Sequence, residues 1–238
     1  MISINGVSKT YGNDKKAVDN LTLEVKSGEI FGFLGPNGAG KSTTIKMLTG
    51  ILKADCGTIT VDGIDLSQEP IKAKSVIGYV PDNHETYETL TGYEYLHFLG
   101  VVYSVPKDVL QQRIDYYADM FKMKEALSDY ISSYSHGMKQ KIMVIGAMIH
   151  QPKVWILDEP LTGLDPQSAH DLKKLMREHA DAGNTVFFSS HIIDVVEKVC
   201  DRIAIINHGK LVAVDTLDAL RESGEVSLEQ LFLDVTQQ

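Results

Sequence analysis

The segment Phe31–Leu48, FGFLGPNGAGKSTTIKML, joins an apolar run to a glycine-rich turn and the start of an amphipathic helix. Its letters GPNGAGKS, from Gly35 to Ser42, match the phosphate-binding loop pattern at every fixed position. Main-chain N–H groups of such a loop point inward at an anion, and the helix N-terminus adds partial positive charge. Lys41 is expected to reach the β- and γ-phosphates, and the Ser42 hydroxyl to bind Mg²⁺. A glycine-rich turn before an ordinary helix is the alternative, but the complete pattern predicts a nucleoside triphosphate site.

Two adjacent carboxylates, Asp158 and Glu159, follow the apolar run Val154–Leu157. Carboxylates that end a buried strand are costly unless a cation meets them. Mg²⁺ held by Ser42 would be that partner for Asp158. Glu159 would then be free to orient or deprotonate a water aimed at the γ-phosphate. Surface carboxylates in a turn are the alternative interpretation.

Asp82 and His191 also follow predicted strands, Ile77–Val80 and Thr185–Phe188. Ligands of parallel sheets gather at the carboxyl ends of the strands, so both side chains are candidates for the same site. His191 could hydrogen-bond the γ-phosphate or the attacking water, and a structural histidine is the alternative. Tyr11, in a turn-rich loop, either packs locally or stacks on an adenine ring.

The remaining strand pattern predicts the sheets that hold these residues. Met1–Val25 and Gly57–Val61 alternate apolar and polar positions, which favours an antiparallel sheet. The strands Ile203–Asn207 and Lys210–Val214 are predicted to form a final hairpin. Ala169–Ala180 has the periodicity of an amphipathic helix.

The middle of the chain, from Thr91 to Lys124, carries aromatic residues at helical spacing. Core packing explains most of them, but so many tyrosines in one stretch also suit a surface that docks a helix from another protein. Farther along, Ser135 is a natural N-cap for a helix that runs to His150. That helix start is either an anion site or a capped helix and nothing more.

Composition limits the possible functions. The chain has 238 residues, 43% of them hydrophobic, so a well-buried core is expected. The net charge of −9 argues against binding to nucleic acid or anionic lipid. Cys56 and Cys200 lie far apart, give no metal or disulfide framework, and are expected in the core. Since no apolar run approaches the roughly 20 residues of a bilayer span, a soluble chain without a secretory leader is expected.

With these motifs in order, the sequence resembles the ATP-binding subunits of ABC transporters. VWILDEP is similar to the Walker B motif with its catalytic Glu159, TGLDP to the D-loop with Asp165, and His191 to the switch histidine. Tyr11 lies where the family has its adenine-stacking aromatic residue. The Walker A resemblance implies nucleotide contacts from Gly35, Pro36, Asn37, Gly38, Ala39, Gly40, Lys41, Ser42 and Thr43.

The resemblance also implies the architecture. It implies an α/β fold with a P-loop NTPase (RecA-like) core, an antiparallel β subdomain and an inserted α-helical subdomain. The ABC ATPase domain would cover residues 1–222. Core and β subdomain would lie in 1–84 and 151–222, and the helical subdomain with the signature motif in 85–150. Residues 223–238 would form a short C-terminal tail.

The sequence departs from the family pattern in the signature motif and at Asp82. YSHGMKQ stands where the family has LSGGQ, so His136 replaces the first glycine and Met138 the glutamine. In the family this motif closes over the ATP of a second subunit, which implies contacts in trans from Ser135, His136, Gly137 and the D-loop Asp165. If His136 lies beside the partner's γ-phosphate, its protonation would favour the closed dimer. Asp82 replaces the usual glutamine, and the expected Mg²⁺ ligands are Ser42, Asp158 and Asp82.

The resemblance implies an ATPase that powers a separate integral membrane permease from the cytoplasmic face of the membrane. The cassette would pair with an identical or paralogous second ATPase subunit around ATP and Mg²⁺. Both departures are similar to those of bacterial ABC-2-type and Ecs-like exporters, so export is expected and import is the alternative. A soluble ABC ATPase acting on ribosomes or DNA is disfavoured because the chain is acidic and lacks a second cassette. A GTPase is disfavoured because no base-recognition N/T-K-x-D stretch occurs.

Overall fold

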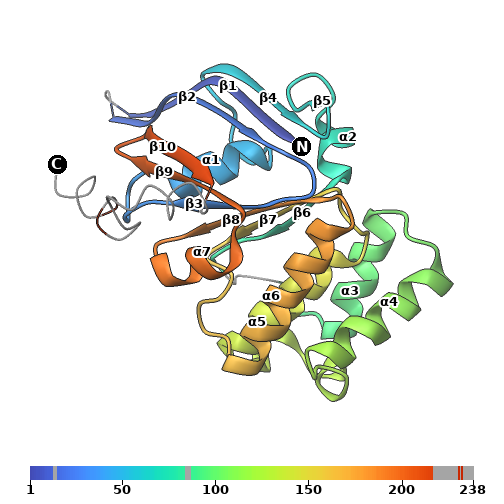
Figure 1. The fold of residues 1–238 in the computed structure, drawn as a ribbon. Coiled ribbons are helices and arrows are strands. Elements are labelled where there is room, and N and C mark those ends of the chain that lie inside the picture. The colour runs from blue at the N-terminus through green and yellow to red at the C-terminus, as the bar shows by residue number, and fades with distance from the viewer. Residues whose placement is uncertain (13–14, 84–86, 217–229, 231, 233–238) are drawn as a thin grey trace.

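Two β-sheets lie on either side of helix α1, and further helices cover the outer face of the second sheet (Figure 1). The computed structural model describes residues 1–12, 15–83, 87–216, 230 and 232. The expected tail, 223–238, falls almost entirely outside these residues, and so does the expected subdomain boundary at 84 and 85.

The first sheet is antiparallel, as its alternating sequence predicts. Among the described residues it has four strands in the order β2-β1-β4-β5. Their inward side chains, such as Ile2, Ile4 and Val25, are buried against α1 and the second sheet. The strands are β1 (Ile2–Tyr11), β2 (Lys15–Val25), β4 (Cys56–Val61) and β5 (Ile64–Asp65).

The second sheet carries the predicted buried strands. Within the described ranges its order is β10-β9-β3-β8-β7-β6, with parallel pairs except for β10, which runs antiparallel to β9. Because β3, β7 and β8 are neighbours, the segments that follow them share one edge of the sheet. The strands are β3 (Ile30–Leu34), β6 (Ile77–Val80), β7 (Val154–Asp158), β8 (Thr185–Ser190), β9 (Arg202–Asn207) and β10 (Lys210–Thr216).

The helices divide between the two faces of this second sheet. Helix α1 (Lys41–Leu48) buries Ile45, Met47 and Leu48 between the sheets. The opposite face of the sheet packs against a larger cluster that includes the aromatic helices of the middle of the chain. The other helices are α2 (Pro70–Ser75), α3 (Gly92–Val102), α4 (Lys107–Met120), α5 (His136–Met148), α6 (Pro166–Asp181) and α7 (Ile193–Val199), with 3₁₀ turns η1 (Glu125–Ser128) and η2 (Ile131–Ser133).

Polar caps fix where the helices begin. Ser135 caps α5 as predicted, since its side chain accepts a hydrogen bond from the Met138 N–H at 3.3 Å. Helix α6 begins three residues before the predicted Ala169. Asp165 caps it by accepting from the Ser168 N–H at 2.9 Å, and Pro166 occupies the first helical position, where a missing N–H costs nothing. Asp165 as an N-cap residue and Pro166 at the first helical position are the sequence signals from which this earlier start could have been predicted.

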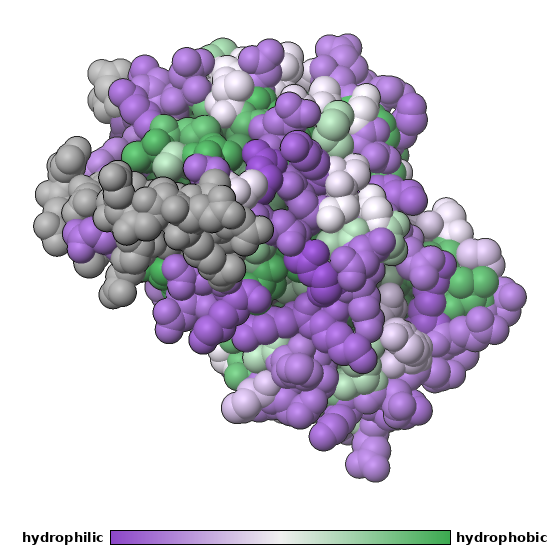
Figure 2. Space-filling view, in the orientation of Figure 1, coloured by the Kyte–Doolittle hydropathy of each residue, from purple (hydrophilic) through white to green (hydrophobic). Residues whose placement is uncertain are grey.

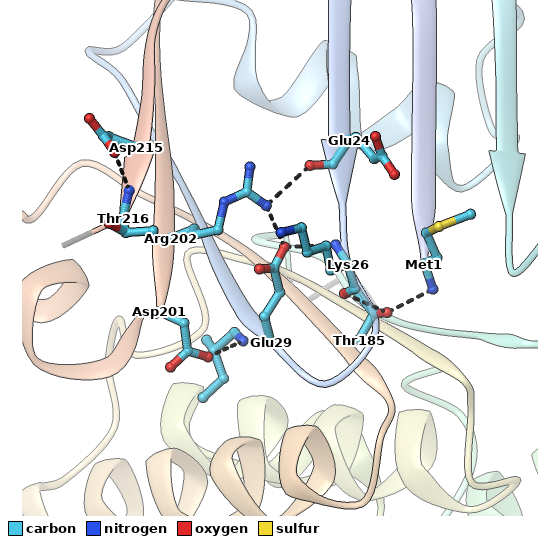
Figure 3. A network of polar contacts seen from close by, with 10 residues as sticks. Met1, Glu24, Lys26, Glu29, Thr185, Asp201, Arg202, Asp215 and Thr216 are labelled. Carbon is cyan, nitrogen blue, oxygen red and sulfur yellow. Dashed lines mark hydrogen bonds and ion pairs between the residues drawn. The ribbon is translucent and has the colours of Figure 1, made fainter. Parts of the chain in front are cut away.

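An ion pair between Glu29, which directly precedes β3, and Arg202 of β9 lies at one end of the second sheet (Figure 3). Glu29 is 7% exposed, and its Oε1 accepts from the Arg202 guanidinium at 2.8 Å and from the Lys26 N–H at 2.7 Å. Arg202 also lies over the Phe31 ring, 5.4 Å from its centroid. Next to it, Asp201 accepts from the Ile30 N–H at 2.8 Å. These contacts hold the start of β3 to β9.

The prediction that both cysteines are core residues is correct for Cys200, which is buried, and wrong for Cys56, which is exposed. Cys56 opens β4, whose first three residues lie outside the core before burial begins at Ile59. In the part of the chain that the structure describes, every helix is too short or too polar to cross a membrane.

Candidate nucleotide site

The glycine-rich loop lies between the carboxyl end of β3 and the first turn of α1. Gly38 and Gly40 adopt φ values of 82° and 112°, which L side chains rarely reach. A Cβ on Gly40 would also lie 2.5 Å from the Ala17 carbonyl oxygen. The loop therefore depends on glycine for both conformation and space, and it delivers Lys41 and Ser42 to the start of the helix.

The Lys41 side chain folds back over this loop. Its Nζ donates to the Gly35 carbonyl at 2.6 Å and to the Pro36 carbonyl at 3.2 Å, and it lies 3.9 Å from Glu159 Oε1. Burial lowers the pKa of Lys41, although the carboxylates of Glu159 and Asp158 act in the opposite direction. The ammonium group thus lies at the mouth of the loop and donates to neutral carbonyl oxygens. A phosphate oxygen could take their place, and it would be a stronger acceptor because it is charged.

Asp158 ends β7 as a buried carboxylate, 4% exposed. Its Oδ1 accepts from the Ser189 hydroxyl at 2.5 Å. Burial raises the pKa of Asp158, the hydrogen bonds from Ser189 and Ser42 lower it, and the nearby Asp82 carboxylate raises it. A buried carboxylate held beside a serine hydroxyl is a donor set that suits Mg²⁺, which binds few protein ligands and shares the rest with phosphate and water.

Glu159 leaves the strand in a left-handed conformation, with φ 49°. Its Oε1 lies 3.0 Å from His191 Nδ1, and its side chain is only 14% exposed. The Glu159 N–H donates to Ser189 Oγ at 3.2 Å. With Glu159 ionised, the short contact requires a proton on Nδ1 of His191, so the carboxylate fixes the orientation of the imidazole.

Lys41, Asp158, Glu159 and His191, all predicted from sequence, thus come together at the edge that β3, β7 and β8 share. Asp82 follows β6 at the border of the sheet, is exposed, and lies near enough to act electrostatically on Asp158 and Lys41.

Tyr11 is 44% exposed at the end of β1, where its Cα pairs with Lys15. Its stacking on adenine stays a prediction.

The other predicted group, Ser135, His136 and Gly137, opens α5 and packs on the D-loop of its own chain. A Cβ on Gly137 would lie 2.9 Å from the Gly163 carbonyl oxygen. The Asp165 carboxylate forms an ion pair with Lys141 of α5, at 3.1 Å. Hydrogen bonds from the Ser168 side chain and main chain, and then Lys141, hold the pKa of Asp165 well below its usual range.

Sequence reasoning assigned no role to Ser189 or Gln140. Ser189 pairs in register with Asp158 across the parallel strands β7 and β8. The sequence signal that could have identified Ser189 is its position at the carboxyl end of a predicted strand, two residues before His191. Gln140 is 1% exposed and donates from Nε2 to the Pro160 carbonyl at 2.8 Å. A glutamine on the predicted buried face of a helix was the signal that it needs a fixed partner.

Among the described residues, no group of three or more His, Cys, Asp and Glu side chains is arranged to hold a metal ion by itself. Ser42, Asp158 and Asp82 therefore suit a metal only when phosphate oxygens or water complete its coordination. The arrangement as a whole can bind a triphosphate through the loop, and it can polarise a water through Glu159 beside the terminal phosphate.

Comparison with known proteins finds the same fold and function class. Residues 18–162 match the family described as "ABC transporter". The chain is 39% identical over 216 residues to the linearmycin resistance ATP-binding protein LnrL of Bacillus subtilis (strain 168), covering 91% of this chain and 69% of LnrL. It is 31% identical over 241 residues to the ABC-type transporter ATP-binding protein EcsA of that organism, covering 100% of this chain and 97% of EcsA. A solved structure described as "Structure of ATP binding subunit of ABC transporter" superposes with a TM-score of 0.93 at 31% identity, covering 99% of both chains.

Proposed function

Because the chain belongs to the ABC transporter family of ATP-binding subunits and is an ATPase, we propose that it powers a separate integral membrane permease by hydrolysing Mg²⁺-ATP. The observation that carries this proposal is the meeting of Lys41, Asp158, Glu159 and His191 beside the phosphate-binding loop. Each of these side chains has the chemistry that one step of phosphoryl transfer needs.

The main-chain N–H groups of the loop from Gly35 to Thr43, which Pro36 lacks, and the Lys41 ammonium bind the phosphates, and Tyr11 stacks on the adenine. Ser42 and Asp158 would hold Mg²⁺, with Asp82 as a further ligand or as a carboxylate that acts through water. The chemistry that a bound ion would supply there is neutralisation of the charge that develops on the phosphate oxygens. Its charge also makes the ionised form of Asp158 favourable, which burial alone opposes.

Glu159 orients the attacking water and accepts its proton as the oxygen approaches the γ-phosphorus. Its carboxylate is 3.0 Å from His191, which keeps it from turning away. A protonated His191 donates from Nδ1 to Glu159 and from Nε2 to a γ-phosphate oxygen, so it ties the general base to the substrate. Lys41, 3.9 Å from Glu159, moves from the loop carbonyls to the phosphates when ATP binds.

A second cassette, identical or paralogous, completes the site. The N-terminus of α5, with Ser135 and Gly137, would bind the γ-phosphate held by the other subunit, since a helix N-terminus attracts anions. Asp165 of the D-loop would approach the same nucleotide.

The permease would dock beside Asp82, on the aromatic helices. Figure 2 shows a mainly hydrophilic face with a hydrophobic patch at the tip where α3 and α4 meet. Val101 and Val102 there are 75% and 57% exposed, and Tyr87 and Phe98 also expose large rings. Exposed apolar area of this kind marks interaction surfaces. We place this subunit on the cytoplasmic face of the membrane, where ATP is supplied.

Export is the direction that we propose. Asp82 and His136 depart from the family pattern as in exporter subunits, and the relative LnrL is named for resistance to linearmycin. Resistance is consistent with removal of a compound from the cell. A secreted binding protein encoded beside this chain would favour import instead.

Substitutions at Lys41 and Glu159 test the proposal. Glu159→Gln keeps the size of the side chain but removes the base, so ATP should stay bound and the two cassettes closed while hydrolysis stops. Lys41→Ala should weaken ATP binding itself. Reconstituted transport that continues unchanged with either substitution in every cassette would contradict the proposal, and wild-type hydrolysis by Glu159→Gln would remove Glu159 as the base.

A further inference from the structure

His136 lies over Gly163, a D-loop residue of the same chain. A Cβ built on Gly163 would overlap Cδ2 of the His136 ring and lie 2.7 Å from its Nε2. Gly163 has φ 78°, which L side chains rarely adopt. The bare Cα of Gly163 therefore forms the surface on which the imidazole rests, and a glycine at position 136 would have no side chain to place there.

Three further contacts join α5 to the same segment. The Gly163 carbonyl oxygen approaches Gly137 so closely that a Cβ there would be 2.9 Å away. The Lys141 ammonium lies 3.1 Å from Asp165 Oδ2, and the buried Gln140 donates to the Pro160 carbonyl at 2.8 Å. The first two turns of α5 thus hold the chain from Pro160 to Asp165 along its length.

The contacts of His136 and Gly137 with Gly163 hold the middle of the segment, and that of His136 is the one made by a side chain. Thr162, Gly163 and Asp165 are all exposed, and Gly163 is conformationally the freest of them. The contacts from Gln140 and Lys141 fix the two ends of the segment, Pro160 and Asp165. Leu161 and Leu164 pack against the core, so without a ring over Gly163 it is the exposed Thr162 and Gly163 that would have to be ordered when another surface meets them, at an entropic cost.

We propose that His136 is a positioning residue that holds the D-loop against α5 in the free subunit, so that both segments meet the second cassette as one preformed surface. The inference rests on the proposed pairing of two cassettes around ATP. It gives the imidazole a role within its own chain, through packing, in place of the contact with the partner's phosphate that the sequence alone suggested.

The test uses ring removal, ring retention and a matched control. His136→Ala removes the ring without placing glycine in the helix, and His136→Phe keeps a planar ring of similar size. His170→Ala removes another exposed histidine, on α6, and serves as the control. Gly163→Ala attacks the same contact from the D-loop, because its Cβ would displace the imidazole.

The first readout is hydrogen exchange of the amides of residues 161–165 in the nucleotide-free full chain. We expect faster exchange in His136→Ala and Gly163→Ala, and exchange as in wild type for His136→Phe and His170→Ala. The double variant His136→Ala with Gly163→Ala should exchange no faster than Gly163→Ala alone, because both changes break one contact. Wild-type exchange in His136→Ala would overturn the proposal.

The second readout is ATP-dependent dimerisation, measured by analytical ultracentrifugation with Glu159→Gln as the parent. His136→Ala should weaken the dimer about tenfold, the order expected for ordering one or two loop residues, and His136→Phe should restore it. ATP affinity of the monomer, read by a fluorescent nucleotide at low protein concentration, should stay within about twofold. An unchanged dimer dissociation constant in His136→Ala would overturn only the proposal that His136 positions the D-loop. A parent that never dimerises with ATP overturns the cassette pairing, and this inference with it.

Discussion

The Ser189 hydroxyl, on β8, donates a hydrogen bond to the buried Asp158 carboxylate. It donates to Oδ1 at 2.5 Å and accepts from the Glu159 N–H at 3.2 Å, and Ser189 itself is fully buried. Ser189→Ala removes both bonds and adds no bulk. A hydrogen bond to a charged group contributes about 1.5–3 kcal/mol. We therefore expect the variant to lose about 2 kcal/mol of unfolding free energy at neutral pH, or about 4–8 °C of Tm.

The loss should depend on pH in a defined direction. Burial already holds the pKa of Asp158 above its ordinary value, so unfolding free energy falls as pH rises from the ordinary range of Asp through the raised pKa. Removing the Ser189 bond, which favours the ionised form, raises that pKa further. The difference between wild type and Ser189→Ala should thus be largest at neutral pH and shrink in acid, where Asp158 is protonated in both.

Urea unfolding at a series of pH values measures this, with Ser190→Ala as the control. The Ser190 hydroxyl accepts from the Ile192 N–H at 3.0 Å at the same sheet edge, and its bond involves neutral groups. Ser190→Ala should cost about 1 kcal/mol at every pH. The acid limb of Mg²⁺-ATPase activity should also move to higher pH in Ser189→Ala alone. A pH-independent loss in Ser189→Ala equal to that of Ser190→Ala would refute the assignment.

Three further substitutions test the electrostatics of the fold. Asp158→Asn should abolish hydrolysis yet raise the neutral-pH Tm of the nucleotide-free protein by about 2–4 °C, because it removes a charge that burial disfavours; an unchanged Tm would contradict this. His179, T-stacked on Trp155, has a pKa lowered by burial to about 4, so stability present above pH 6.5 is lost as pH falls toward 4. Urea titrations at pH 7 and pH 4 should show that His179→Phe loses about 3 kcal/mol less unfolding free energy between these pH values than wild type does. Equal losses in the two proteins would exclude the mechanism. Arg202→Met should cost about 3–5 kcal/mol by leaving Glu29 buried and unpaired, and adding Glu29→Gln should recover most of it, as denaturant curves would show.

Much of the fold and site follows from local sequence, because the relevant signals are contiguous. The loop from Gly35 to Ser42 carries its glycines, lysine and serine in one run, so position and chemistry are specified together. Alternating and continuous apolar runs identified β1, β3, β7 and β8, and the carboxyl ends of β7 and β8 located Asp158 and His191.

Contacts between distant segments could not be predicted from such signals. Ser189 meets Asp158 only because β7 and β8 pair in one particular register, and a shift by one residue would turn the hydroxyl to the other face. The packing of His136 on Gly163 depends on the D-loop returning to α5, which leaves no local pattern. Cys56 was misplaced because β4 begins before it reaches the core.

The roles of all the other site residues depend on the binding of ATP and Mg²⁺ by the loop that ends in Lys41 and Ser42. Isothermal titration calorimetry of the folded wild-type chain with Mg²⁺-ATP, beside Lys41→Ala of equal far-UV circular dichroism, tests it most directly. We expect one site per chain in wild type and affinity reduced at least about tenfold in the variant, since a buried charged contact contributes more than about 1.4 kcal/mol. No heat of association from folded wild type, or equal affinity in both proteins, would contradict it.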